Sequence, residues 1–382
     1  MRHFDTMAKF IAPNDPWHYP RPELAKKYLE IFGIGLTSAR GLFAKRRMGK
    51  SEFLEKDLIP AAQAEGYLTV YLNLWDARTH PTPSLVSALS RAMEPKGLFK
   101  LVARLNTPLK KVKASGKIPG LAEGSLEAEL ADDPAVAGPL LSELLRGFDK
   151  PGKRMLLVLD EAQVLASPLH SELAHSLRAS LDSRKQNIKV VFAGSSEPTL
   201  RRMFGRSTEP FYNWAPLEPF ELLGTEFVRE MVRKVNKLSR YPLTDEDALA
   251  AFLALHNTPE FFRRYLNHYL AYAELGATAA LEDTQKHVFN GANFKDLWGK
   301  LLAADQEILK LLAQGVTELH SEPVRLQLGN ALGLDKPVSK NTPQHSLRRL
   351  QDENLVAKLD YGSYQLQDDA FAEWLRNLEL DN

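Results

Sequence analysis

The stretch Gly41 to Leu54 reads GLFAKRRMGKSEFL, and the rest of the chain is interpreted outward from it. A short apolar run leads into a loop of small and basic residues, and after Gly49 apolar residues recur at helical spacing. The loop fits a phosphate-binding pattern, with Ala44 in the small first position, four further residues, then glycine, Lys50 and Ser51. The stretch therefore predicts a strand, a phosphate-binding loop and a helix, in that order.

The order of these residues suits the phosphates of a nucleotide. Successive backbone N–H groups and the positive end of a helix dipole surround a phosphate in such loops. Lys50 would bring charge to the outer phosphates, and the Ser51 hydroxyl would be a ligand for Mg²⁺, which takes oxygen atoms and keeps most of its waters. Arg47 either strengthens the positive field or is solvated. The predicted nucleotide contacts are Ala44, Arg47, Met48, Gly49, Lys50, Ser51 and Glu52.

A second stretch, Met155 to Gln163, reads MLLVLDEAQ and places two carboxylates directly after an apolar run. The run predicts a fully buried strand, and ligands bind at the carboxyl ends of strands in open parallel sheets. Asp160 is the predicted magnesium ligand beside Ser51. Glu161 is predicted to orient and polarise the attacking water, as phosphoryl transfer requires. The alternative is that the two acidic residues only cap the following helix.

Further apolar runs indicate the fold class. Helical connections between the runs predict a parallel sheet with helices on both faces, and so an α/β fold. Ser195 follows the fourth run, where its hydroxyl would contact the γ-phosphate, cap the next helix, or do both. The predicted strands are at 39–44, 67–74, 155–160 and 188–194, with a short fifth strand near 214–220.

The composition limits the classes of protein that remain. A chain of 382 residues, 44% of them hydrophobic, can form two or three domains with sizeable cores. The 49 basic and 48 acidic residues nearly cancel, so nucleic-acid binding would need a local basic patch. The absence of cysteine excludes disulfides, thiolate zinc sites and a cysteine nucleophile. Without a signal-peptide pattern or a long apolar segment, we expect a cytoplasmic protein that makes no membrane contact.

Two segments outside these runs have two interpretations each. Residues 1–22 predict an irregular lead-in, followed by a helix to Ile34. In the lead-in, Trp17 or Tyr19 either stacks on the nucleotide base or fixes the lead-in to the core. The basic segment 105–130 predicts an inserted hairpin, whose lysines either protect a solvated edge or contact a nucleic-acid backbone.

The C-terminal half of the chain is predicted to be largely helical. Helices are expected at 225–238, 244–256 and 259–274, and in the third of them Arg263 or Arg264 could reach over the phosphates. The remaining residues predict helices at 303–312, 323–332 and 342–353, a hairpin over 355–366 and a closing helix at 371–378, which together describe a winged helix.

The predicted winged helix has a modest basic face. Such a face suits phosphate contacts rather than the reading of bases, and winged helices also serve as protein-docking modules. Its basic residues are Lys336, Lys340, His345, Arg348, Arg349 and Lys358.

Taken in order, five segments make the chain resemble the AAA+ class of P-loop ATPases: AKRRMGKS, LLVLDEAQ, VVFAGSS, NTPEFFRR and the closing LRRLQDENLVAKLDYGSYQLQDDAFAEWL. Within that class the chain is similar to the archaeal-type ATPase and origin-initiator-like group. That group joins an ATPase core and a helical lid to a C-terminal winged helix. The resemblance implies ATP and Mg²⁺ as cofactors and hydrolysis of ATP as the reaction.

The resemblance also implies roles for individual residues. Ala44 departs from the glycine that such loops usually have, the residue that best accepts a positive φ. The implied correspondences are Lys50 and Ser51 with the Walker A pair, Asp160 and Glu161 with Walker B, Ser195 with the first sensor, Arg263 or Arg264 with the second sensor, and Arg206 or Arg202 with an arginine finger that acts on a neighbouring subunit.

We therefore expect a lead-in and helix (1–35), a P-loop ATPase core (36–222), a helical lid (223–298) and a winged helix (299–382). The expected function is a Mg²⁺-dependent ATPase whose nucleotide state controls binding to double-stranded DNA or to a DNA-associated partner. It would act as a homo-oligomer or with a partner protein. The alternatives are a slow nucleotide switch like the STAND ATPases, acting through protein partners, and an interaction module in which ATP is mainly structural.

Overall fold

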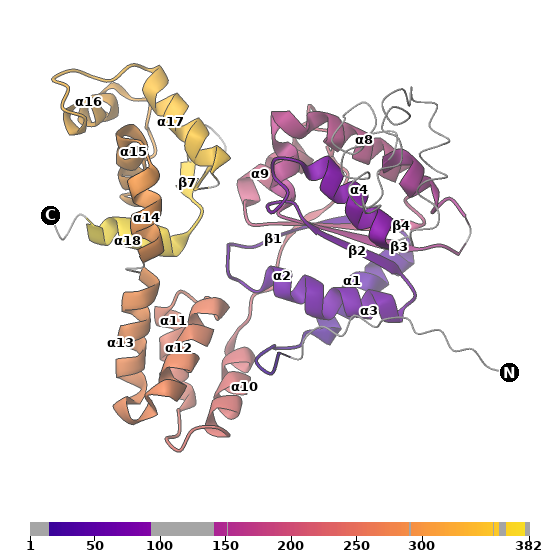
Figure 1. Cartoon of the computed structure of the whole chain (residues 1–382), viewed down its shortest axis with the longest axis horizontal. Coiled ribbons are helices and arrows are strands. Elements are labelled where there is room, and N and C mark those ends of the chain that lie inside the picture. Colours follow the sequence, from indigo (N-terminus) through magenta and orange to yellow (C-terminus); the bar gives the residue numbers. More distant parts are fainter. Residues whose placement is uncertain are drawn as a thin grey trace, which may run out of the picture.

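The computed structural model describes residues 15–92, 141–150, 152–289, 292–353, 355–358 and 364–378. The hairpin expected over 105–130 lies outside these residues. In the part of the chain that is described, a parallel sheet with helices on both faces forms a core, and two further units lie beside it (Figure 1). The α/β fold predicted from the sequence is confirmed.

The sheet contains β1 (Ala39–Phe43), β2 (Leu68–Asn73), β3 (Met155–Asp160), β4 (Ile188–Gly194) and β5 (Leu217–Pro219). The strands lie in the order β2-β3-β4-β1-β5, and each neighbouring pair is parallel. Both β3 and β4 are buried along their whole length, which explains their uninterrupted apolar sequences. Because β4 lies between β1 and β3, the ends of these three strands adjoin at the carboxyl edge of the sheet.

Helices cover the two faces of the sheet with alternate strand residues beneath them (Figure 1). Leu156 and Val158 face α1, α2 and α3, whereas Leu157 and Leu159 face the helices of the other layer. A π-helical turn, Leu54–Leu58, joins α2 to α3, so the helical run after the phosphate-binding loop continues to Ala64. The helices are α1 (Pro22–Ile34), α2 (Lys50–Phe53) and α3 (Ile59–Ala64) on one face, and α4 (Pro81–Ala92), α8 (Ser171–Asp182) and α9 (Glu197–Gly205) on the other.

The second unit is helical and has its own apolar core. Phe262 and Tyr265 are completely buried in it. The sequence predicted its first three helices, and a fourth follows after a short 3₁₀ turn. We call this unit the lid; it contains α10 (Thr225–Asn236), α11 (Asp245–Ala254), α12 (Pro259–Ala271) and α13 (Gly276–Phe289).

The third unit, called the C-terminal unit, contains α14 (Ala292–Lys300), α15 (Ala303–Ala313), α16 (Glu322–Ala331), α17 (Asn341–Asp352), β6 (Val356–Lys358), β7 (Tyr364–Leu366) and α18 (Asp369–Leu378). From α15 onward, three helices, an antiparallel strand pair and a helix follow one another as the sequence predicted. The rings of Trp298 and Trp374 lie 5.7 Å apart, so α14 packs on this unit although the sequence grouped it with the lid.

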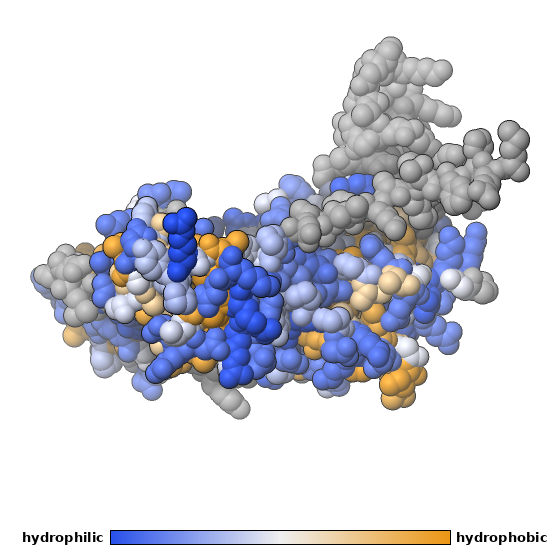
Figure 2. Space-filling model, turned by 90° about the horizontal axis from the view of Figure 1, so that it is seen from below, coloured by the Kyte–Doolittle hydropathy of each residue, from blue (hydrophilic) through white to orange (hydrophobic). Residues whose placement is uncertain are grey.

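The lid and the C-terminal unit stand together beside the core, and α13 and α14 run from one to the other (Figure 1). Seen from below, hydrophilic side chains cover most of the described surface, and hydrophobic ones form separate small patches (Figure 2). Among the described residues, no helix has both the length and the apolar character needed to cross a bilayer.

Candidate nucleotide-binding site

The phosphate-binding loop joins the carboxyl end of β1 to the first turn of α2. Gly49 precedes this turn with φ 80°, a left-handed conformation that glycine adopts without steric cost. Arg47 has φ 65°, which is unusual for a residue other than glycine. Ala44 is buried behind the loop, where its N–H donates to the carbonyl of Gly194. Its small side chain fits this position, but it does not line the cavity described next.

A cavity of about 1310 Å³ opens between the loop and the lid. It is large enough for a nucleotide, since ligand pockets are commonly 300–1,000 Å³. The core contributes loop residues, Asn73 at the end of β2 with Trp75 just beyond it, and Glu161 after β3. The predicted contacts that line this cavity are Arg47, Met48, Gly49, Lys50, Ser51, Glu52, Glu161, Arg263 and Arg264.

Asp160 is completely buried at the end of β3 and is surrounded by donors. Lys50 Nζ lies 3.1 Å from its Oδ1, and the hydroxyls of Ser51 and Tyr71 both donate to its Oδ2. Burial alone would raise the pKa of this carboxyl. The Lys50 charge, the Ser51 hydroxyl and the N–H of Glu161 outweigh burial and lower the pKa below its usual value. Asp160 is therefore held as a carboxylate beside the loop.

Glu161 adopts a left-handed backbone conformation, with φ 52°. It precedes a 3₁₀ turn, Ala162–Ala166, but its side chain makes no capping hydrogen bond. Instead its Oε2 accepts hydrogen bonds from the Ser195 hydroxyl, at 2.7 Å, and from the Gln163 amide. Its Oε1 lies 3.5 Å from Lys50 Nζ. The left-handed backbone costs about 1–3 kcal/mol and persists because these contacts hold it.

The oxygen donors at the loop fit a magnesium ion. Ser51 and Asp160 present a hydroxyl and a carboxylate in direct contact, and Mg²⁺ usually takes one or two protein oxygens together with phosphate and water. In the described part of the chain, no cluster of three or more His, Cys, Asp or Glu side chains could hold a metal ion by itself. This donor set suits a metal that arrives with a phosphate ligand.

Four arginines from the sequence analysis lie in different surroundings. Arg263 lines the cavity, but its guanidinium lies 3.0 Å from Asp15 and 3.4 Å from Glu52. Arg264 also lines the cavity and pairs with Glu260 at 2.6 Å. Arg202 donates to the carbonyl of Ala166 at 3.2 Å, whereas Arg206 is exposed just beyond α9. Neither Arg202 nor Arg206 lines the cavity of its own chain.

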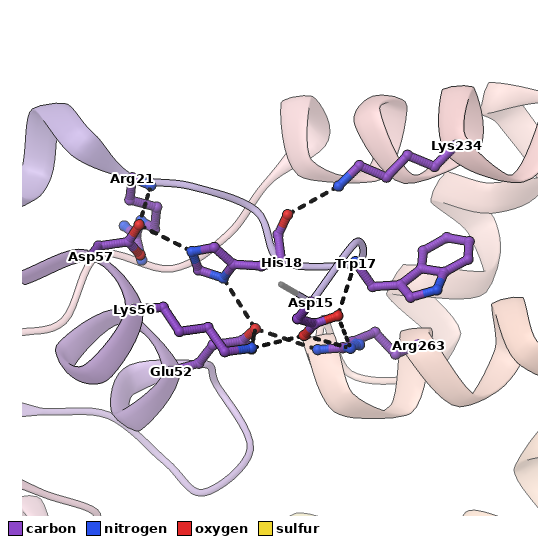
Figure 3. A network of polar contacts seen from close by, with 9 residues as sticks. All are labelled: Asp15, Trp17, His18, Arg21, Glu52, Lys56, Asp57, Lys234 and Arg263. Atoms are coloured by element: carbon purple, nitrogen blue, oxygen red, sulfur yellow. Dashed lines mark hydrogen bonds and ion pairs between the residues drawn. The ribbon is translucent and has the colours of Figure 1, made fainter. Parts of the chain in front are cut away.

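The lead-in is joined to the core and the lid by a polar network (Figure 3). His18 Nδ1 lies 3.1 Å from Glu52, and its Nε2 lies 3.0 Å from Asp57. Its hydrogen bonds with Asp57 and then with Glu52 raise the pKa of His18 to about 9. Burial would raise the pKa of Glu52, but the hydrogen bond with His18 leads the contacts that lower it to about 2. Lys234 from α10 donates to the backbone carbonyl of His18 at 3.0 Å.

The two aromatic residues of the lead-in pack against the lid. Trp17 and Tyr19 are partly buried on the lid core, and the Tyr19 ring meets Phe227 edge to face at 5.6 Å. The cavity beside them has a volume of only about 20 Å³, roughly the space of one water. In this conformation they fix the lead-in, and stacking on a base would require the lead-in to move.

Sequence reasoning did not single out several residues that the structure brings to this site. Gln163 lay within the quoted acidic stretch, and Tyr71 and Asn73 lay within a predicted strand. The spacing along each strand places Tyr71 and Asn73 on the same side, near the end of β3. Asp15, His18 and Asp57 gave no signal, because their partners are distant in sequence.

The sheet order and the carboxylates at the end of β3 beside the loop define a class of fold, the α/β P-loop fold of the AAA+ type. No protein-family model matches the sequence. No curated protein matches it either.

Solved structures of two archaeal proteins are similar to this chain over most of its length. A Walker-type ATPase of Pyrococcus abyssi has 20% identity and a TM-score of 0.57, covering 93% of this chain and 95% of that chain. The ORC2 protein of Aeropyrum pernix, in ADPNP-ADP complexes, has 15% identity and a TM-score of 0.51, covering 94% and 93%. The ADP form of the Aeropyrum pernix protein has 15% identity and a TM-score of 0.52, covering 94% of this chain and 93% of that chain. The chain therefore has the fold of archaeal, origin-initiator-like AAA+ ATPases.

Proposed function

We propose that this protein is a Mg²⁺-dependent ATPase whose nucleotide state controls what its C-terminal unit binds. One observation carries the proposal: the Lys50 ammonium lies at the end of the phosphate-binding loop, 3.1 Å from Asp160 and 3.5 Å from Glu161. A lysine, a buried carboxylate and a second carboxylate that faces the cavity are the groups that phosphoryl transfer to water requires. The similar ORC2 structures, which are described as complexes with ADPNP and ADP, support a nucleotide as the ligand.

The chain's residues would divide the reaction among them. Loop N–H groups and Lys50 would hold the β- and γ-phosphates of ATP. Ser51 and Asp160 would hold Mg²⁺, which would supply charge neutralisation on the phosphates when bound. Glu161 would orient a water toward the γ-phosphorus and accept its proton. The bond between that phosphorus and the bridging oxygen would break, giving ADP and inorganic phosphate.

The proposal is tested by steady-state ATP turnover of the wild type and Glu161→Gln, measured with Mg²⁺, across protein concentrations, with and without double-stranded DNA. We expect turnover in the wild type and a fall of at least about 100-fold in the variant, the scale of a lost general base. Equal turnover in both proteins contradicts the proposed site. Turnover that rises with DNA and with protein concentration supports an assembly acting on DNA.

The arginines near the end of α9 are the candidates for contacting the nucleotide of a neighbouring subunit. Arg206 is exposed and outside the cavity of its own chain, which is where an arginine that acts on a neighbouring subunit would lie. Arg202 is already bonded to the chain's own Ala166 carbonyl and pairs with Glu209 at 3.6 Å. The structure therefore favours Arg206 over Arg202 as the finger of a homo-oligomer.

Control of the C-terminal unit is supported by contacts between that unit and the nucleotide site. Arg47 of the loop pairs with Asp368, at the start of α18. Gln367 donates to the Ser196 hydroxyl at 3.1 Å, and both side chains are buried. A nucleotide that changes the loop or the end of β4 would therefore act directly on these contacts.

DNA is the proposed partner of the C-terminal unit, interpreted as a winged helix. On α17, His345 and Arg348 are exposed and able to contact a phosphate backbone. Arg349 is less suited to contact DNA, because its guanidinium makes two hydrogen bonds to the buried carboxylate of Asp305, at 3.0 and 2.6 Å. That carboxylate also raises the pKa of Arg349.

The contacts of Arg47 and Ser196 with the C-terminal unit also favour the second candidate, a slow nucleotide switch that acts through a protein partner. In that case the closed arrangement would hold nucleotide, and exchange would release the C-terminal unit. Slow turnover that responds neither to DNA nor to protein concentration would select the switch. A module in which ATP is only structural would instead show no downstream effect of Glu161→Gln.

A further inference from the structure

The proposed reaction assigns no role to the side chain of Gln163, yet this side chain contacts both Glu161 and Ser195. It projects from the 3₁₀ turn after β3 and is almost completely buried. Its amide nitrogen donates both to Glu161 Oε2 and to Ser195 Oγ, the latter at 3.3 Å. The Ser195 hydroxyl in turn donates to the same Glu161 oxygen at 2.7 Å. Three side chains thus form a closed triangle of hydrogen bonds.

The directions of these hydrogen bonds are fixed by chemistry. A carboxylate only accepts, so the amide of Gln163 must turn its NH₂ group, and not its oxygen, toward Glu161. Both amide hydrogens are then used, and the single hydroxyl hydrogen of Ser195 is directed at Glu161. The Ser195 hydroxyl therefore donates to Glu161 here, whereas the sequence left open a contact with the γ-phosphate, capping of the next helix, or both.

The triangle gives the two carboxylate oxygens of Glu161 different surroundings. Oε2 receives two donors and is fixed, whereas Oε1 lies 3.5 Å from Lys50 Nζ and Glu161 borders the cavity. When phosphates occupy the loop, the Lys50 ammonium has a new partner of opposite charge. Oε1 is then the oxygen left to accept a proton from water.

Two further observations indicate that the Gln163 side chain is placed here for its amide N–H donors. Its amide oxygen is buried and has no hydrogen-bond partner among the residues that the structure describes, an arrangement that does not favour stability. Next to it, a Cβ on Gly194 would overlap that oxygen and approach Leu200 Cδ1 at 3.0 Å. The glycine at the end of β4 thus makes room for the Gln163 amide.

We propose that Gln163 is a positioning residue for Glu161. Its amide fixes the carboxylate directly and through Ser195, so that Oε1 faces the water-binding position. The inference rests on the proposed function, because it requires Glu161 to act on the attacking water.

The test is the turnover number and KM of Gln163→Leu, together with its affinity for a non-hydrolysable ATP analogue. Leucine keeps much of the side-chain volume but donates nothing. We expect kcat to fall about 10- to 100-fold with KM and affinity within about two-fold of wild type, because misplacement of a reacting group acts on the chemical step. Turnover is expressed per nucleotide-binding site counted by titration with the analogue, because a loss of folded protein alone would lower the apparent kcat without changing KM.

Gly194→Ala is the second variant and decides the test if Gln163→Leu does not fold. It displaces the amide while Glu161 and Ser195 remain unchanged, so kcat is expected to fall in the same way. Asn187→Leu is the matched control: it removes another amide, bonded to the Phe148 carbonyl at 2.6 Å, at the opposite end of β4. We expect its kcat to match that of the wild type.

The outcomes separate the inference from the function on which it rests. If Glu161→Gln abolishes turnover while Gln163→Leu and Gly194→Ala keep wild-type kcat, the inference is overturned and the ATPase stands. If the variants change KM alone, the inference is overturned as well. If the wild type shows no turnover, or Glu161→Gln shows as much, both the function and the inference fail.

Discussion

At the scale of the residue, Asp160 illustrates how the site accommodates a buried charge. Removing a carboxylate from water costs several kcal/mol, and a single counter-ion seldom offsets this cost. Here an ammonium, two hydroxyls and a backbone N–H surround the carboxylate. The same groups that stabilise the charge are those that a phosphate and a magnesium ion would engage, so ligand binding must rearrange them.

Gly49 provides a prediction at this scale. Gly49→Ala should lower the free energy of unfolding by about 1 kcal/mol and weaken ATP binding, because φ 80° is unfavourable for alanine. Gly33→Ala, in α1, is the control, since both sites have open space for a Cβ but only Gly49 has a positive φ. It should stabilise the protein by about 0.5 kcal/mol or leave it unchanged. Urea unfolding and ATP titration measure both variants, and equal effects would contradict the backbone argument.

At the scale of the element, the lead-in links the core to the lid. Asp15 is bonded to Lys56 of the π-helical turn, at 2.8 Å, and to Arg263 of α12. His18 is bonded to Glu52 and Asp57. Because Arg263 also borders the cavity, the lead-in and a bound phosphate would compete for the same guanidinium.

The pH dependence of stability tests this network. The folded pKa of His18, about 9, exceeds its ordinary 6.5, so its contribution is complete below pH 6.5 and is lost as the pH rises through 9. We expect the free energy of unfolding to fall by roughly 1 kcal/mol over that range, the scale of a hydrogen bond to a charged group that is partly exposed to water.

Urea unfolding of the wild type at pH 6 and at pH 9 measures this fall. In His18→Gln, the free energy of unfolding should differ much less between pH 6 and pH 9 than it does in the wild type. The control is His175→Gln, which replaces an exposed histidine on α8. Its free energy of unfolding should differ between the two pH values as much as that of the wild type. If His18→Gln keeps the full wild-type difference, His18 is not the titrating group.

At the scale of the whole molecule, the loop residue Arg47 joins the three units. Its guanidinium pairs with Asp368 of the C-terminal unit and lies 3.5 Å from Glu260 and 5.3 Å from the Phe261 ring of the lid. Because Arg47 is itself part of the phosphate-binding loop, occupancy of the loop can alter contacts with both units at once. A bound nucleotide would thereby have a direct physical route to the C-terminal unit.

Asp368→Ala should loosen the C-terminal unit, because among the described residues Arg47 then retains partners only in the lid. The sequence has no cysteine, so cysteines introduced at Glu172 on α8 and at Lys336 before α17 would be the only thiols to label. We expect energy transfer between dyes at these sites to be lower in the variant than in the wild type without nucleotide, and ATP to lower it in the wild type. Asp352→Ala, an exposed carboxylate at the end of α17, is the control. Identical transfer in all forms would contradict the linkage.

The local parts of this molecule were predictable from the sequence. Apolar runs such as MLLVLD indicated buried strands, and Gly49-Lys50-Ser51 marked the start of a helix, because each pattern reflects neighbouring residues only. The lid was predicted less completely, because α13 follows α12 after only a short turn and α14 continues beyond it. No local pattern shows that Trp298 packs against Trp374 rather than on the lid core.

The sequence by itself determined an α/β protein with a phosphate-binding loop and two carboxylates after a buried strand. Only the tertiary structure decided that β4 lies between β1 and β3, that Ser195 is directed at Glu161, and that Arg47 meets Asp368. The physical reason is range. Periodicity and turn chemistry act over a few residues, whereas the last two contacts join positions 34 and 321 residues apart, which only the packing of whole elements can bring together.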